Sequence, residues 1–227
     1  MKTLTHQIPL TRIQKLISRR MLESKRTKPC FYVEAKADVT QLMAIRPRLR
    51  KSLGIRITTN AFYIHALGLA ARRFPLAAGR FEGECVRLAE QINVGFAVNA
   101  PQGLVVPVIR DAHQKTLPEI ARLEKRLTDK ARDNELTLED VEGETIALSN
   151  LGAYGIDSFL GIVPPPACTI LSVGNVVPAV VCRDGEVAVR KLLSMSLAAD
   201  RRIISETYAA EFMTFIKHHL EDPQQLT

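Results

Sequence analysis

Proton transfer near neutral pH is the chemistry that histidines would perform in this chain, because the pKa of imidazole lies close to the working pH. The five candidates are His6, His65, His113, His218 and His219. Their positions form no readable Asp-His-Ser or Cys-His arrangement. His65 lies in a nearly all-apolar segment, which favours a core or interface residue. His218 and His219 lie near the C-terminus, where surface exposure is the ordinary explanation.

The cysteines are too widely spaced to suggest a metal centre. They are Cys30, Cys85, Cys168 and Cys182, with no CxxC and no Cys/His pairing, so no metal site is predicted. We interpret them as reduced, mostly buried thiols. The chain has no apolar run of about 18 residues and no apolar block at its start. We therefore expect no membrane span and a cytoplasmic location, or the mitochondrial matrix in a eukaryote.

The formal net charge is +7, and much of the basic excess lies early in the chain. The residues concerned are Arg12, Lys15, Arg19, Arg20, Lys25, Arg26 and Lys28. A solvated helix face followed by a basic loop is the favoured interpretation, and a site for phosphate groups is the alternative. Only 5% of the residues are aromatic and there is no tryptophan, so nucleic acid is not an expected partner.

Apolar spacing predicts the helices that must position any site. They are expected at 11–26 with Thr11 as N-cap, 40–53 ending at Gly54, 61–73 capped by Asn60, 117–133 capped by Thr116, 137–141, and 205–220 stopped by Pro223. Pro47 falls inside the second helix and should bend or interrupt it. The 61–73 segment is apolar most of the way round, so it should be buried.

Alternating and β-branched segments predict the strands. They are expected at 31–39, 92–99, 104–109, 144–149, 168–174 and 194–199, with a hairpin at 178–183 and 186–193. The hairpin should turn at residues 183–185, because an Asp-Gly pair supplies positive backbone dihedrals. The clustering of strands late in the chain favours an α+β fold, a two-layer α/β sandwich with a mixed sheet. No GxGxxG follows a strand and no P-loop occurs, which argues against nucleotide-binding folds of those kinds.

Short fragments in a fixed order carry a resemblance to a known family. They are Pro9-Leu10 through Arg20-Met21, Ala37-Asp38-Val39-Thr40, Val94-Gly95-Phe96-Ala97-Val98, Gly103-Leu104-Val105-Val106-Pro107-Val108, Leu148-Ser149-Asn150-Leu151-Gly152, Pro165-Pro166, and Leu171-Ser172-Val173-Gly174. Together they resemble the catalytic domain of the acyltransferase (E2) components of 2-oxoacid dehydrogenase complexes. That family also has a D-H-R-x-x-D-G motif before its last helix, which is matched here by residues 200–206 in degenerate form.

The resemblance implies a chloramphenicol-acetyltransferase-like fold, assembled as a homotrimer with an active site at each subunit interface. One chain would supply a histidine and its neighbour a serine. Residues 1–227 would form a single catalytic domain, with no lipoyl or peripheral-subunit-binding domain. No cofactor would be covalently bound, and coenzyme A and a lipoyl group would be the candidate substrates. Other 2-oxoacid dehydrogenase subunits would be partners, and the polar C-terminal end favours a lone trimer over a cage.

The family motifs also assign site residues. Ser149 stands at the position that stabilises an oxyanion, and the nearby Asn150 and Gly152 are expected to contact substrate. His65 lies in the region of the family's substrate contacts. Asp200 and Arg202 retain the frame of the second motif, where a structural ion pair is expected.

The two residues of that second motif that perform chemistry are exchanged. Arg201 replaces the catalytic histidine and Ser205 replaces the aspartate or asparagine, while Glu206 replaces a glycine and is placed to pair with Arg201. Two other segments also depart from the family's sequence motifs, Pro75-Leu76-Ala77-Ala78 and Pro164-Pro165-Pro166-Ala167.

Two functions are compatible with this pattern. The first is an E2-like structural or assembly subunit that lacks the usual transfer of an acyl group from dihydrolipoamide to coenzyme A. A guanidinium is protonated throughout the useful pH range and has no acceptor nitrogen, so it cannot act as the base. The alternative is an active acyltransferase with altered chemistry, in which Arg201 holds coenzyme A or an anionic acyl donor and Ser149 binds the oxyanion.

Overall fold

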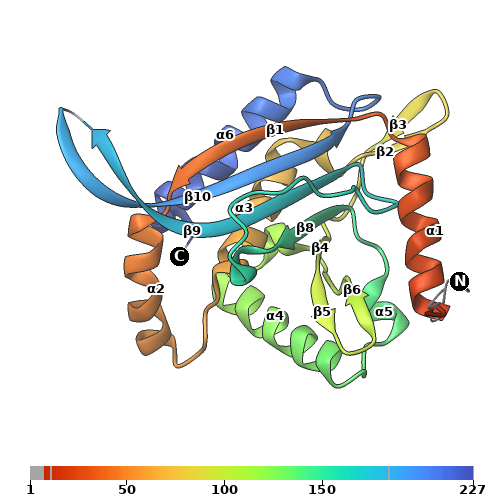
Figure 1. The fold of residues 1–227 in the computed structure, drawn as a ribbon, viewed down its shortest axis with the longest axis horizontal. Coiled ribbons are helices and arrows are strands. Elements are labelled where there is room, and N and C mark those ends of the chain that lie inside the picture. Colours follow the sequence, from red (N-terminus) through yellow and green to blue (C-terminus); the bar gives the residue numbers. More distant parts are fainter. Residues whose placement is uncertain (1–7, 11, 184, 227) are drawn as a thin grey trace, which may run out of the picture.

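The computed structural model describes residues 8–10, 12–183 and 185–226, and it has two layers (Figure 1). The first is a six-stranded mixed sheet in the order β1-β10-β9-β8-β4-β7. Its strands are β1 (Cys30–Asp38), β10 (Glu186–Asp200), β9 (Thr169–Arg183), β8 (Ile146–Asn150), β4 (Val94–Phe96) and β7 (Val108–Ile109). The pairs β4–β8 and β8–β9 are parallel, and the others are antiparallel. The expected α+β sandwich with a mixed sheet is therefore confirmed.

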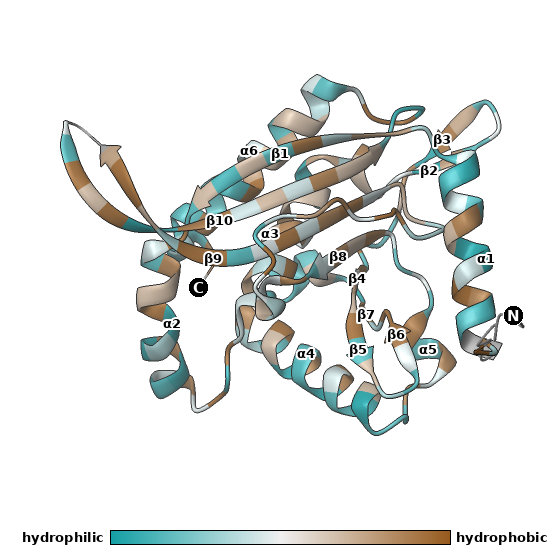
Figure 2. Cartoon of the chain, viewed as in Figure 1, coloured by the Kyte–Doolittle hydropathy of each residue, from teal (hydrophilic) through white to brown (hydrophobic). Residues whose placement is uncertain are grey.

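The second layer is formed mainly by α3 (Thr59–Arg73) and α6 (Glu206–Glu221). The other helices are α1 (Arg12–Thr27), α2 (Thr40–Leu53), α4 (Leu117–Arg132) and the short α5 (Leu138–Val141). Helices α3 and α6 pack on one face of the sheet, and α4 packs against α3. Figure 2 shows the contrast between the polar surface of α4 and the largely apolar α3, which is enclosed by its neighbours. No helix in the described part of the chain is both long and apolar enough to span a membrane.

Two expectations about helices need correction. Pro47 does not interrupt α2, which continues to Leu53 and ends at Gly54 in the left-handed conformation. Pro47 is exposed, so the single hydrogen bond it removes lies on the solvent side. Asn60 is not the N-cap of α3, because Thr58 has the extended backbone of a cap and its hydroxyl accepts from the Ala61 amide at 3.1 Å. Thr11 lies outside the described residues.

Some of the predicted strands are interrupted in the structure, and others are joined into longer strands. The predicted strand 92–99 is divided between β4 and β5 (Val98–Ala100), and β5 pairs only with β6 (Gly103–Val105) in a small second sheet. The predicted strand 104–109 breaks at Pro107, which has no N–H to donate. The predicted 168–174, 194–199 and hairpin strands fuse instead into two strands of 15 residues, β9 and β10. Asp184 of the predicted turn lies outside the described residues.

Part of the β9–β10 pair extends beyond the sheet as a two-stranded ribbon (Figure 1, upper left). In the body of the sheet β10 is flanked by β1 from Leu192 onward, and β9 is flanked by β8 only up to Val173. A small hairpin formed by β2 (Arg80–Glu82) and β3 (Cys85–Arg87) was not predicted. Its strands are too short to show a periodicity.

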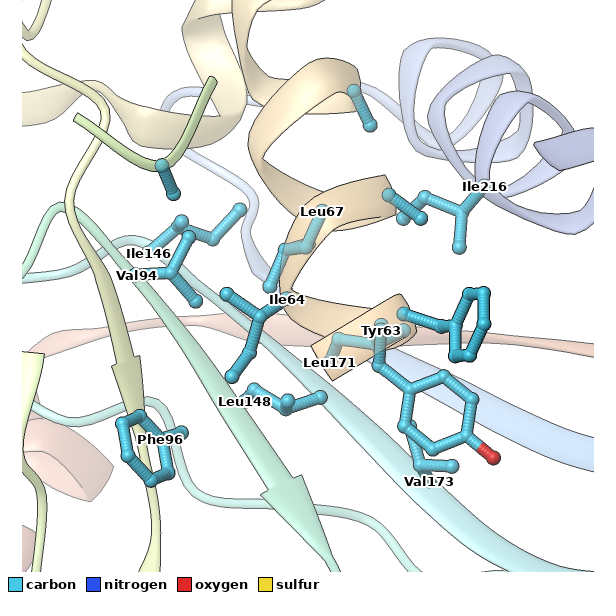
Figure 3. Close-up of a cluster of buried hydrophobic side chains, with 14 of the residues drawn as sticks. Tyr63, Ile64, Leu67, Val94, Phe96, Ile146, Leu148, Leu171, Val173 and Ile216 are labelled. Carbon is cyan, nitrogen blue, oxygen red and sulfur yellow. The ribbon is translucent and has the colours of Figure 1, made fainter. Parts of the chain in front are cut away.

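The main core lies between α3 and the sheet (Figure 3). Tyr63, Ile64 and Leu67 of α3 face Leu148 of β8 and Leu171 of β9, and all five are at most 2% exposed. Burying such side chains contributes about 1.5–3 kcal/mol each before the entropy of ordering is subtracted. This packing fixes β8, and therefore fixes the position of the loop that follows it.

Candidate active site

Ser149 lies at the end of β8, one residue beyond the buried Leu148, and its side chain is half-buried. It opens into a cleft of about 440 Å³ that is bounded by β4–β6, the start of α3, α4 and the loop after β8. The residues of the cleft that matter here are Asn60, Glu124, Ser149, Asn150, Arg132 and Tyr154. We call it the Ser149 cleft. Its polar side chains come from segments far apart in the sequence.

Two asparagines fix the loop after β8. The Asn150 side-chain amide donates to Asn60 Oδ1 at 2.7 Å, and the Gly152 backbone N–H donates to Asn150 Oδ1 at 2.8 Å. Gly152 itself lies against β9, because a Cβ at this position would be 2.3 Å from the carbonyl oxygen of Gly174. Packing therefore requires glycine at position 152, independently of the substrate contact that was expected from the family motif.

Glu124 of α4 is a buried residue of this cleft that was not predicted from the sequence. It is 6% exposed, and the Thr58 hydroxyl donates to its Oε2 at 2.7 Å. Burial raises the pKa of the Glu124 carboxyl, and hydrogen bonds from the Thr58 and Asn60 side chains act in the opposite direction. A signal was present in the sequence, because residues 117, 120, 124 and 127 follow helical spacing and place Glu124 on the apolar face of α4.

Arg201 and Ser205 occupy the segment between β10 and α6. Arg201 Nε donates to Glu206 Oε1 at 2.8 Å, and both side chains are more than half exposed. The pairing anticipated from the sequence is therefore present. Ser205 is the N-cap of α6, and its hydroxyl oxygen accepts from the Tyr208 amide at 3.3 Å.

Asp200 and Arg202 form the ion pair expected from the motif. Asp200 is 1% exposed, and Arg202 binds it through two nitrogens, with Nη2–Oδ2 at 2.6 Å and Nε–Oδ1 at 2.9 Å. The Arg202 guanidinium also stacks over the Phe81 ring, 4.3 Å from its centroid. These contacts tie the end of β10 to the small β2–β3 hairpin.

The histidines in the described part of the chain do not line the Ser149 cleft. His65 is buried in α3, where burial lowers its pKa and the Leu226 backbone provides a hydrogen bond. His113 lies in the 3-10 turn 112–114, and His218 and His219 lie in the last turn of α6. The structure does not bring His65 together with Ser149, and His6 lies outside the described residues. Nor do the described residues contain a group of three metal-ligating side chains.

Within one chain, Ser149 and Arg201 lie far apart. Ser149 pairs across the sheet with Ser172, and Ser172 pairs with Ser196. Arg201 follows Ser196 by five residues, which is about 16 Å along the strand direction. Arg201 lies toward the end of the sheet where β8 begins, whereas Ser149 lies where β8 ends. A site that combines both positions would require two chains.

Comparison with known proteins places this geometry in context. A family model described as "2-oxoacid dehydrogenases acyltransferase (catalytic domain)" matches residues 2–227. The acetyltransferase component of the pyruvate dehydrogenase complex of Rickettsia felis is 34% identical over 220 residues, covering 95% of this chain and 53% of that protein. The mouse pyruvate dehydrogenase protein X component is 32% identical over 225 residues, covering 97% and 45%. The chain thus spans about half the length of these curated relatives.

Solved structures agree. The dihydrolipoamide acetyltransferase of Azotobacter vinelandii, whose serine, histidine and asparagine were investigated for their roles in catalysis, has a TM-score of 0.94 and 28% identity, covering 99% of this chain and 95% of that one. A probable dihydrolipoamide acetyltransferase from Listeria monocytogenes has a TM-score of 0.92 and 31% identity, covering 96% and 95%. Chloramphenicol acetyltransferase, at 13% identity and a TM-score of 0.52 with coverage of 90% and 92%, shares the fold.

Proposed function

Because the chain belongs to the acyltransferase catalytic-domain family of the 2-oxoacid dehydrogenases, we propose that it is an E2-type subunit with a structural or assembly role. In this proposal it does not perform the family's transfer of an acyl group from dihydrolipoamide to coenzyme A. The observation that carries the proposal is Arg201, a guanidinium paired with Glu206 at the position of the family's catalytic histidine.

The chemistry explains why this exchange matters. Acyl transfer to coenzyme A needs a thiolate, and a thiol with a pKa near 8.5 is mostly protonated at neutral pH. A positioned base removes that proton and typically contributes about 10²–10⁴ in rate. Arginine has no acceptor nitrogen and stays protonated. Ser205 cannot supply a negative charge, and its hydroxyl is engaged as the cap of α6.

The assembly part of the proposal is a homotrimer with the Ser149 cleft at each subunit interface. It is supported by the separation of Ser149 from Arg201 within one chain. The named relatives are components of the pyruvate dehydrogenase complex, so we propose other subunits of such a complex as partners, in the cytoplasm or the mitochondrial matrix. Light scattering should give the mass of three chains, and a cage mass would contradict the lone trimer.

The test of the structural role is a direct assay with acetylated dihydrolipoamide and coenzyme A. We expect no turnover above the uncatalysed rate. Ser149→Ala is the diagnostic variant, because it removes the hydroxyl that would bind the oxyanion and alters no hydrogen bond described here. Turnover by the natural chain that Ser149→Ala abolishes would refute the structural-subunit proposal.

A second candidate function is supported by Glu124. A carboxylate in the Ser149 cleft, with a pKa raised by burial, has the properties of a general base. In this reaction the thiol of coenzyme A transfers its proton to Glu124, and the thiolate attacks the thioester carbonyl. Ser149 donates to the resulting oxyanion. Collapse then expels the dihydrolipoyl thiolate, which takes the proton back from Glu124, while Arg201 of a neighbouring chain holds the anionic part of a substrate.

The two candidates are separated by one matched pair of variants. If Glu124 is the base, Glu124→Gln should lower turnover by about 10²–10⁴. Glu135→Gln makes the same chemical change at an exposed position outside the cleft and should leave turnover unchanged. Turnover that survives Glu124→Gln would eliminate the second candidate.

A further inference from the structure

A small cavity lies between the β2–β3 hairpin, the segment just before β8 and the loop that leads into β9. Its volume is about 200 Å³, and it shares no lining residue with the Ser149 cleft. The side chains used below are the apolar Ala78, Leu88, Ala89, Pro166 and Ala167 and the charged Arg80, Arg87 and Glu144. We call it the Glu144 cavity.

The two segments that depart from the family's motifs, 75–78 and 164–167, meet at this cavity. Ala78 is the last residue of the first segment and Ala167 the last residue of the second, and they are 4% and 2% exposed. Side chains ordinarily fill protein interiors at close packing. An alanine side chain is a single methyl group, so the space beside each of these two residues stays open.

The loop wall of the cavity is fixed by basic side chains near the end of α1. The Arg20 guanidinium donates to the Pro165 carbonyl, and the Lys28 ammonium donates to the Ala167 carbonyl. Part of the basic excess early in the chain thus holds this loop in place. A wall that is already ordered lowers the entropic cost of binding a ligand.

Glu144 places a weakly compensated carboxylate on the cavity wall. It is 5% exposed, and Arg20 Nη2 lies 3.4 Å from its Oε1, whereas charge-assisted bonds of this kind are usually about 2.7–2.9 Å long. Burial raises the pKa of the Glu144 carboxyl, although its own backbone amide and the charge of Arg20 act in the opposite direction. A buried carboxylate with so distant a partner favours the entry of a further cation.

The β2–β3 hairpin adds an uncompensated positive charge at the exposed side of the cavity. Arg80 and Arg87 face each other across the two strands. Arg87 pairs with Glu82 at 2.8 Å. Within the described part of the chain, no carboxylate lies within 4.0 Å of the exposed Arg80. The cavity therefore combines a negative charge on its buried wall with a free positive charge at its rim.

We propose that the Glu144 cavity binds a small aliphatic amino acid, with the ammonium group on Glu144 and the carboxylate at Arg80. The apolar side chain would pack on Leu88, Ala89 and Pro166. A volume of about 200 Å³ is below the range of about 300–1,000 Å³ of sites for drug-sized ligands, so the ligand has few heavy atoms.

The charges exclude simpler ligands of the same size. An amine without a carboxylate would meet the like charge of Arg80, and a carboxylic acid without an amine would meet the like charge of Glu144. The zwitterion matches both ends of the cavity. The site requires no acyl transfer, so it goes beyond the function proposed above and does not depend on it.

Isothermal titration calorimetry of the full chain with L-alanine, L-valine and L-leucine tests the proposal. We expect saturable binding of one molecule per chain for at least one of the three. The tightest binder is then compared with the amine that lacks its carboxylate and with the acid that lacks its ammonium group. Each analogue should bind about tenfold more weakly or worse, because it loses one charge-assisted contact. Absence of saturable binding by all three amino acids would overturn the proposal.

Variants test the two assigned contacts separately. Glu144→Gln should weaken amino acid binding about tenfold or more. Arg80→Gln should weaken amino acid binding to a similar extent, yet it should not weaken binding of the amine analogue, which has no carboxylate. A loss of amine binding in Arg80→Gln would contradict the assigned orientation.

Glu139→Gln is the matched control. Glu139 is an exposed glutamate that does not line the Glu144 cavity, so the variant makes the same change of net charge elsewhere. It should change the affinity less than twofold, and circular dichroism should show that all three variants are folded. Equal losses of affinity in Glu139→Gln and Glu144→Gln would overturn the proposal, since they would show an effect of net charge only.

Discussion

The side-chain amide of Asn150 donates a 2.7 Å hydrogen bond to the side-chain carbonyl of Asn60. This bond joins the loop after β8 to the first turn of α3. Because the Asn60 carbonyl accepts from Asn150, its amide nitrogen is free to donate to Glu124. The loop that carries Ser149 and the buried carboxyl of α4 are therefore parts of one polar network.

Removing the central member of that network should destabilise the fold. Asn60→Ala removes the acceptor of the Asn150 side-chain amide and one of the two donors to Glu124, and we expect the free energy of unfolding to fall by about 1–3 kcal/mol. Urea unfolding measures the change. Asn99→Ala is the control, since Asn99 lines the same cleft but is exposed and has only a 3.4 Å contact with Tyr154. Equal losses in the two variants would contradict the network.

The buried carboxyl of Glu124 should make stability depend on pH. Its folded-state pKa is raised, so the native chain holds this proton to higher pH than the unfolded chain does. The free energy of unfolding should therefore fall as pH rises from about 4.3, the pKa of an unfolded glutamate, through the folded-state pKa. Glu124→Gln removes this dependence.

Urea unfolding at pH 5 and pH 8 makes the pH test quantitative. The stability of Glu124→Gln relative to the natural chain should increase between the two pH values, because only the natural chain must ionise the buried Glu124. Glu135→Gln, at an exposed position, should show a constant difference. A difference between Glu124→Gln and the natural chain that does not change with pH would mean that Glu124 does not titrate as described.

The two neighbouring arginines of the motif should respond differently to truncation. Arg202→Ala leaves Asp200 buried without its bidentate partner, and we expect a loss of about 3–5 kcal/mol. Arg201→Ala breaks only an exposed pair with Glu206, so stability should change little. Thermal unfolding of the two variants side by side is sufficient. Similar melting temperatures would show that the Asp200–Arg202 pair is not structural.

Restoring the family residues should restore chemistry if the structural-subunit proposal is right. The triple variant Arg201→His, Ser205→Asp, Glu206→Gly supplies a base and its acidic companion. Asp caps helices as well as Ser does, so α6 should keep its start. We expect coenzyme A–dependent acyl transfer at least about 10²-fold above the natural chain. Adding Ser149→Ala should remove it, and a folded but inactive triple variant would show that the Ser149 cleft is itself altered.

The sequence was most informative where local rules act alone. The cap of α4 was predicted at Thr116, and the structure has the full capping box there with Glu119. The end of α2 at Gly54 was likewise predicted, and Gly54 has the left-handed conformation that glycine tolerates best. Asn60 was wrongly predicted to be the N-cap of α3, because threonine and asparagine both favour the N-cap position. Thr58 caps α3 instead, and the Asn60 side chain is drawn into the tertiary network.

Features that depend on distant contacts could not be predicted locally. The division of β4 from β5 depends on pairing, since the Ala97 amide bonds to Leu148 while β5 turns away to meet β6. Family motifs placed Ser149 in the sequence, but its cleft and the buried Glu124 become visible only when α4 and β8 are brought together. The cavity lined by Arg46, Arg50 and Arg56 likewise depends on the return of the chain after Gly54.

The close approach of Gly152 to Gly174 has a consequence for how this chain can vary. The loop after Ser149 is held by the contact of Gly152 with Gly174 of β9 and by the side-chain carbonyl of Asn60 in α3, and neither belongs to the turn before α6. The Ser149 loop and the segment 201–206 are therefore held in place by separate sets of contacts. The exposed Arg201 and Glu206 are free to diverge while the Ser149 loop keeps its shape, so tolerance to substitution should be high at these two positions and low at Gly152 and Gly174.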